Sequence, residues 1–119
     1  YSNFITTARE AVEFVEEVDH PNVGVALDGF HLAREDRPPA ECIQEAGDNL
    51  AHLHSDGNTG RGAAAGTLDY APILKALSKV GYEGYLSLEI HELIFDEVSK
   101  TIDPVAIAEE SLTHLRSLR

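Results

Sequence analysis

The segment Val23–His31, VGVALDGFH, decides the fold. Its first five residues are all apolar or small, which is typical of a parallel strand buried on both faces. The run ends on Asp28, and His31 follows three residues later. A buried strand that ends in an acid, with an imidazole soon after it, is typical of a catalytic or metal-binding edge in an α/β protein. Asp28 by itself also fits a simpler role, as the cap of a turn or of the next helix.

Composition bounds the class of protein. The chain has 119 residues, of which 43% are apolar, so it has the size of one domain with a real core. Its 21 acidic and 9 basic residues give a net charge of −12. This balance argues against a nucleic-acid partner and against binding to an anionic membrane, because both need clustered Lys and Arg. No apolar run is long enough to span a bilayer, and no signal peptide is visible.

The single cysteine, Cys42, excludes an internal disulfide and fits a reducing compartment, so we expect a cytoplasmic protein. Cys42 lies within a helical pattern, which predicts a small buried residue in preference to a nucleophile.

Helical and strand patterns alternate along the chain. The sequence predicts strands over 23–28, 50–54 and 85–90, and helices over 5–19, 38–47, 72–81 and from 103 onward. Thr7 and Glu10 have the spacing of a capping box, and Pro72 is expected to start the third helix. The last helix should begin at Asp103 and Pro104 and turn an apolar face inward, formed by Val105, Ala108, Leu112 and Leu115.

This alternation, at about 30 residues per unit, is typical of right-handed crossovers on a parallel sheet. The first helix has no strand before it, and a closed eight-stranded barrel needs roughly 250 residues. We therefore expect residues 1–119 to be one partial domain: the last three βα units of a (β/α)8 TIM barrel plus a preceding helix. The N-terminal half of that barrel would be missing, and the chain indeed starts at Tyr1 without a Met. The concave face should then be exposed or covered by another chain, and a homo-oligomer is one such state.

Chemically active side chains recur at all three predicted strand ends. Asp28 ends the first strand, His52 and His54 lie on the second, and Glu89 ends the third. Strand ends of this kind form the active-site rim of a barrel. Mixed oxygen and nitrogen ligands suit Mn²⁺, Mg²⁺, Co²⁺ or Zn²⁺, and a carboxylate-rich set favours Mn²⁺. We prefer His54 to His52 as the ligand because it lies nearer the strand's C-terminal end. Simpler interpretations remain open: His52 can be a hydrogen-bonded interior histidine, and Glu89 can be a charge at a strand end.

Four motifs in this order carry a family resemblance: LDGFH at 27–31, HLH at 52–54, the loop RG…GTLDY at 61–70 and GYEGYLSLE at 81–89. With them the chain resembles the C-terminal half of the xylose isomerase-like barrel superfamily, and most of all its sugar phosphate isomerase/epimerase branch, which includes the ketose 3-epimerases. The resemblance implies a sugar or sugar phosphate isomerase or epimerase, which moves a proton through an enediolate with the help of a divalent metal.

The resemblance also implies roles for particular residues. Asp28, His54 and Glu89 match three of the family's four metal ligands, and the fourth, a Glu, would lie just before Tyr1. Glu89 would also be one of the two acid–base carboxylates. His31 and Arg61 match positions that bind the substrate's oxygens.

Two rivals stay open. An apurinic endonuclease of the same superfamily would carry an Asp-x-His pair after the seventh strand of the barrel, which corresponds to the predicted strand over 50–54. In this chain Asp56, Gly57 and Asn58 follow that strand instead. A truncated barrel that only binds a ligand or partner is the other rival. The intact set of rim residues argues against it.

Overall fold

The centre of the computed structural model is a parallel sheet of three strands in the order β1-β2-β3. The structure describes residues 3–57, 62–90 and 103–118. The strands are β1 (Val25–Asp28), β2 (Leu50–His54) and β3 (Leu86–Ser87). Because all the pairings are parallel, the three strands end at the same edge of the sheet, which is the arrangement predicted from the sequence.

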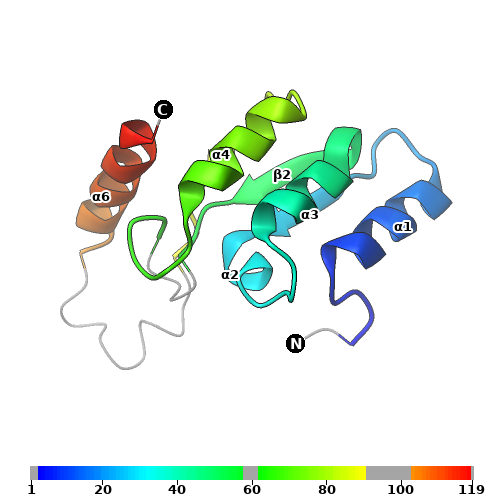
Figure 1. The fold of residues 1–119 in the computed structure, drawn as a ribbon, viewed down its shortest axis with the longest axis horizontal. Coiled ribbons are helices and arrows are strands. Elements are labelled where there is room, and N and C mark those ends of the chain that lie inside the picture. Colours follow the sequence, from blue (N-terminus) through cyan, green and yellow to red (C-terminus); the bar gives the residue numbers. More distant parts are fainter. Residues whose placement is uncertain (1–2, 58–61, 91–102, 119) are drawn as a thin grey trace.

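Helices cover one face of this sheet (Figure 1). They are α1 (Ala8–Val18), α2 (Gly29–Leu32), α3 (Pro39–Ala46), α4 (Tyr70–Lys79) and α6 (Pro104–Ser117), with a 3-10 turn over Gly47–Asn49. Figure 1 shows α1, α3 and α4 side by side in front of the sheet, with α6 beyond α4. Strands and helices thus alternate along the chain, as the sequence predicts. Within the described ranges, no helix has the length and apolar character needed to cross a membrane.

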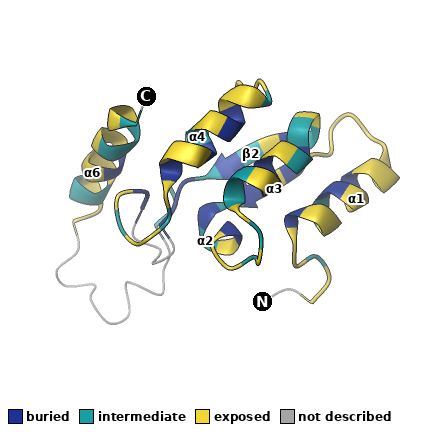
Figure 2. Ribbon diagram, in the orientation of Figure 1, coloured by how far each residue is buried: buried dark blue, intermediate teal, exposed yellow. Residues whose placement is uncertain are grey.

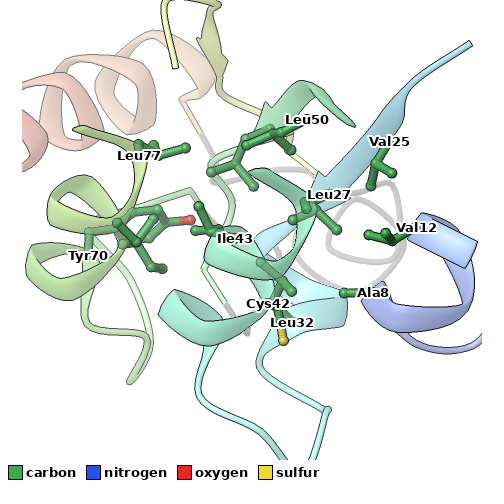
Figure 3. Packing of buried hydrophobic residues seen from close by; sticks show 14 of the residues in the cluster. Ala8, Val12, Val25, Leu27, Leu32, Cys42, Ile43, Leu50, Tyr70 and Leu77 are labelled. Atoms are coloured by element: carbon green, nitrogen blue, oxygen red, sulfur yellow. The ribbon is translucent and has the colours of Figure 1, made fainter. Parts of the chain in front are cut away.

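The core lies between the sheet and the helices (Figures 2 and 3). Leu27 and Leu53, which pair across β1 and β2, point into it together with Ile43 of α3. On the opposite face of the sheet, Ala26 is exposed and its partner across the strands, His52, is partly exposed. The prediction that the first strand is buried on both faces is therefore wrong for this chain, because the helices described here cover only one of them.

Two strands are shorter than their apolar runs. β1 begins at Val25, because the Val23 N–H donates to His20 O at 2.9 Å in the turn that follows α1. β3 covers two residues where the sequence predicts a strand over 85–90. The last residue of β2, His54, already pairs with Ser87, so β2 offers no further residue to pair with those that follow.

The start of α4 is determined by its capping residue and not by the proline that the sequence analysis used. α4 begins at Tyr70, two residues before the predicted start, because the Asp69 side chain accepts the Ala71 N–H at 2.9 Å. Pro72 then lies in the first turn, where a helix needs no N–H donor. The short α2 lies between the predicted strand over 23–28 and the predicted helix over 38–47, and the Asp28 side chain caps it.

The helix α6 starts as predicted, with Asp103 as its cap and Pro104 as its first residue, but its inward face differs. Ser111 is buried, whereas Val105, Ala108 and Leu112 are exposed and Leu115 is partly buried. The reason is local packing against Gly62, at which a Cβ would lie 2.5 Å from Ser111 Oγ and 3.1 Å from the Ile107 side chain.

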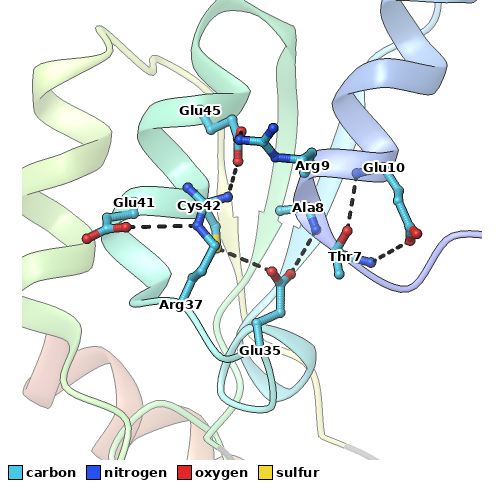
Figure 4. Close-up of polar contacts among 9 residues, drawn as sticks. All are labelled: Thr7, Ala8, Arg9, Glu10, Glu35, Arg37, Glu41, Cys42 and Glu45. Atoms are coloured by element: carbon cyan, nitrogen blue, oxygen red, sulfur yellow. Dashed lines mark hydrogen bonds and ion pairs between the residues drawn. The ribbon is translucent and has the colours of Figure 1, made fainter.

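The start of α1 has the predicted capping box (Figure 4). Thr7 Oγ1 accepts the Glu10 N–H at 3.2 Å, and Glu10 Oε2 accepts the Thr7 N–H at 3.1 Å. Both bonds satisfy N–H groups that the first helical turn leaves unpaired. The helix ends at Val18, and the next residue, Asp19, is its C-cap and has a positive φ of 44°.

Polar side chains tie α1 to the segment that carries α3 (Figure 4). Glu35 Oε1 accepts the Ala8 N–H at 2.8 Å, and Arg9 pairs with Glu45 of α3 at 2.9 Å. Cys42 is fully buried, as predicted, and its Sγ donates to Glu35 Oε2 at 3.5 Å. Burial and the nearby Glu35 charge raise the pKa of the Cys42 thiol to about 11, so the thiol stays protonated at neutral pH.

Candidate metal centre

Three potential metal ligands meet at the C-terminal edge of the sheet. Asp28 is the last residue of β1, and His54 is the last residue of β2. The register places His54 beside Asp28 on one side and beside Ser87 of β3 on the other. Glu89 follows Ser87 by two residues, and its side chain reaches His54.

The distances between these groups fit a shared cation. His54 Nδ1 lies 2.9 Å from Glu89 Oε2 and 3.3 Å from Asp28 Oδ2. One nitrogen and two carboxylate oxygens, all within 4.8 Å of one another, form the group. The side chains of Asp28, His54 and Glu89 are 17%, 38% and 45% exposed, so the group is open on one side. This donor set suits Mn²⁺, Mg²⁺, Co²⁺ or Zn²⁺, and three ligands leave coordination positions for further oxygens.

The structure also places the second histidine of the HLH motif. The ring of His52 stands edge-on to that of His54, with the ring centroids 5.0 Å apart. His52 is not in the group of ligands found among the described residues, whereas His54 is. The structure thus places His54 beside Asp28 and Glu89, and the choice of His54 as the metal ligand stays a prediction.

Asp28 caps α2 and also faces His54, so its role as a metal ligand stays a prediction. Its Oδ1 accepts the N–H groups of Phe30 at 2.9 Å and His31 at 3.2 Å, and thereby caps α2. Its Oδ2 faces His54. The cap therefore fixes the direction of the oxygen that is free to bind a cation.

The candidate substrate residues lie apart from this group or outside the described residues. His31 lies on α2, is exposed, and lines a groove together with Thr7 and Arg34. The ring of Phe30 packs edge-on against the His31 ring at 5.5 Å between centroids. Arg61 lies outside the described residues, so its predicted role stays a prediction.

Sequence reasoning missed Asp56, a buried acid next to the group. Only 1% of it is exposed, and its Oδ1 accepts the Phe30 N–H at 2.7 Å. Burial, together with the negative charge of Asp28, raises the pKa of Asp56 to about 6. The backbone carbonyl of Asp56 accepts the hydroxyl of Tyr70 at 2.6 Å. The available signal was an acid two residues after His54 at a strand end, the position where parallel sheets gather functional groups.

Comparison with known proteins places the chain in a family. The family model described as xylose isomerase-like TIM barrel matches residues 1–118. The chain therefore belongs to the xylose isomerase-like TIM barrel family, as the motifs predicted.

Individual relatives narrow the resemblance to ketose 3-epimerases. The D-psicose 3-epimerase of Ruminiclostridium cellulolyticum is 39% identical over 85 residues, which cover 71% of this chain and 29% of that protein. The L-ribulose 3-epimerase of a Methylomonas species is 31% identical over 104 residues, which cover 85% of this chain and 36% of that protein. The chain thus spans about a third of the length of these relatives.

The fold agrees with a solved structure from the same branch. The crystal structure of D-psicose 3-epimerase from Clostridium cellulolyticum H10 with D-tagatose superposes with a TM-score of 0.86 at 29% identity. The match covers 98% of this chain and 45% of that one. The predicted fold class, a fragment of a TIM barrel, is confirmed.

Proposed function

We propose that the protein containing this chain is a metal-dependent ketose 3-epimerase. The observation that carries the proposal is the convergence of Asp28, His54 and Glu89 at the edge where three parallel strands end. The names of the relatives support the same reaction class. The substrate would be a small ketose or its phosphate, with no nucleic acid and no membrane involved.

Each residue has a role that follows from its chemistry. Asp28, His54 and Glu89 hold the divalent ion, with Mn²⁺ preferred because two of the three ligands are carboxylates. The ion, when bound, supplies positive charge beside the substrate oxygens that become negative as a proton leaves the neighbouring carbon. Glu89 takes or returns that proton, since a carboxylate is the base that this partly exposed position offers. His31 and Arg61 orient the substrate's hydroxyl groups.

The location and the assembly of the protein are separate proposals. The single cysteine is compatible with the cytoplasm, and we propose that location. The face of the sheet that carries Ala26 and His52 leaves room for further parts of the barrel or for a second chain. A homo-oligomer therefore stays a prediction.

The test is proton exchange in D₂O. The full protein with Mn²⁺ is incubated with a panel of ketoses, their phosphates and their 3-epimers, and deuterium is followed at the carbon beside the carbonyl. We expect exchange with at least one ketose. Glu89→Gln should reduce the exchange rate at least about 10²-fold, because the amide keeps an oxygen ligand but loses the base.

Two controls sharpen this test. His52→Gln changes a histidine beside the site that has no proposed role in it, and it should retain most of the exchange. Exchange that persists at the wild-type rate in Glu89→Gln would remove Glu89 from the mechanism. Absence of exchange with every sugar would contradict the epimerase proposal: nicking of abasic DNA by the same protein would then favour the endonuclease, and ligand binding alone would favour a non-catalytic barrel.

A further inference from the structure

Asp56 has no part in the proposed chemistry, yet its carboxylate is buried beside the candidate metal centre. A buried carboxylate is costly unless hydrogen bonds compensate for the lost water. The Phe30 N–H supplies one such bond, at 2.7 Å to Asp56 Oδ1. The same N–H lies 2.9 Å from Asp28 Oδ1, so two acids from the ends of neighbouring strands share one donor.

The backbone of Asp56 is held as firmly as its side chain. Its carbonyl accepts the hydroxyl of Tyr70, a residue that is 1% exposed at the start of α4. Burial raises the pKa of that hydroxyl, which therefore stays protonated and able to donate. Gly29 lies against both groups: a Cβ there would be 2.6 Å from Asp56 O and 2.7 Å from Tyr70 Oη. The first turn of α2 is thus packed directly against Asp56, with α4 behind it.

This contact bears on the direction of the Asp28 side chain. Asp28 Oδ1 holds the start of α2, while Asp28 Oδ2 faces His54. Asp56 is the second acceptor of the Phe30 N–H, so this N–H links α2 to the end of β2 as well as to β1. The first turn of α2 would therefore stay in position when a cation binds Asp28. The turn also carries His31.

We propose that Asp56 is a positioning residue: by binding the Phe30 N–H, its carboxylate keeps Asp28 Oδ2 directed at His54 and keeps His31 at the rim. The proposal rests on the proposed function, since it assumes that a metal binds at Asp28 and His54. It predicts that a side chain that touches neither the metal nor the substrate controls the affinity for the metal.

The test compares Asp56→Ala with Asp56→Asn in the full protein, without any sugar. Two quantities are measured: the Mn²⁺ dissociation constant by calorimetry, and the amide hydrogen exchange of Phe30 and His31. Loss of a group that orients a metal ligand commonly weakens metal binding by about 10–100-fold, and we expect Asp56→Ala to fall in that range with faster exchange of both amides. Asp56→Asn should bind nearly as tightly as the wild type, because its amide oxygen still accepts the Phe30 N–H.

Asp69→Ala is the matched control. It removes a carboxylate that caps a helix at the same end of the sheet, but this one accepts the Ala71 N–H, which belongs to α4 and not to α2. Its Mn²⁺ affinity should equal that of the wild type.

Three results would overturn the positioning role: wild-type Mn²⁺ affinity and amide exchange in Asp56→Ala, equal weakening in Asp56→Asn, or equal weakening in Asp69→Ala. A wild-type protein that binds no Mn²⁺ would instead contradict the proposed function. The amide exchange of Phe30 and His31 in Asp56→Ala would still decide the positioning role in that case.

Discussion

At the scale of single residues, the two side-chain oxygens of Asp28 have different partners, one in the fold and one in the candidate site. Oδ1 binds the N–H groups at the start of α2, and Oδ2 faces His54. A carboxylate is well suited to both tasks because it has lone pairs on both oxygens. The position of a cation at this edge is therefore coupled to the packing of α2.

Cys42 gives a prediction about pH. Its thiol is fully buried, and its pKa is raised from 9.0 to about 11. Below pH 9 the thiol is protonated in both the folded and the unfolded state. Between about pH 9 and 11 only the unfolded state loses this proton, so the Cys42 contribution to the free energy of unfolding falls as the pH rises. Chemical denaturation at pH 8 and pH 10.5 should show a larger loss of stability in the wild type than in Cys42→Ala.

The reactivity of the same thiol provides a second readout for this prediction. In the native protein at pH 8, a thiol reagent should modify Cys42 only as fast as the protein unfolds. Rapid modification under native conditions, or equal alkaline destabilisation of the wild type and Cys42→Ala, would show that the thiol is not buried with a raised pKa.

The sequence placed Asp28, His54 and Glu89 together because parallel strands end at one edge, a rule that needs no knowledge of side-chain packing. Asp56 escaped this reasoning, since its burial depends on how α2 and α4 pack around the end of β2. The same holds for Tyr70, whose hydroxyl contact joins residues 14 apart in the sequence. Contacts of this kind have no periodic signal.

At the scale of elements, hydrogen bonds determine where each helix and strand starts and ends. Only some of these bonds can be predicted from the sequence. The capping box of α1 and the cap of α6 were predictable, because both are local sequence patterns. The length of β3 was not, because it depends on where its neighbour β2 stops. The buried face of α6 was likewise not predictable, because its packing against Gly62 determines it more than the spacing of its apolar residues.

The capping box of α1 supports a prediction about stability. Thr7→Ala removes the oxygen that accepts the Glu10 N–H, and a lost N-cap of this kind costs about 1 kcal/mol. Thr7→Ser keeps the hydroxyl and should retain most of the free energy of unfolding, as measured by urea denaturation. Equal destabilisation by both substitutions would mean that the methyl group, and not the cap, is the stabilising part of Thr7.

At the scale of the whole molecule, helices cover one face of the sheet (Figure 1), and Ala26 on the other face is exposed. The chain covers 45% of the solved D-psicose 3-epimerase that it superposes on. The proposed function is therefore a proposal for a complete barrel, in which Asp28, His54 and Glu89 would form one side of the rim.

The central claim is that His54 shares a metal ion with the two acids, and pulsed electron paramagnetic resonance of Mn²⁺ bound to the full protein tests it most directly. A ring nitrogen bound to Mn²⁺ produces a ¹⁴N modulation that oxygen ligands do not. We expect this modulation in the wild type and in His52→Gln, and its loss in His54→Gln, in which an amide replaces the ring. A modulation that survives in His54→Gln and disappears in His52→Gln would contradict the assignment of the metal site.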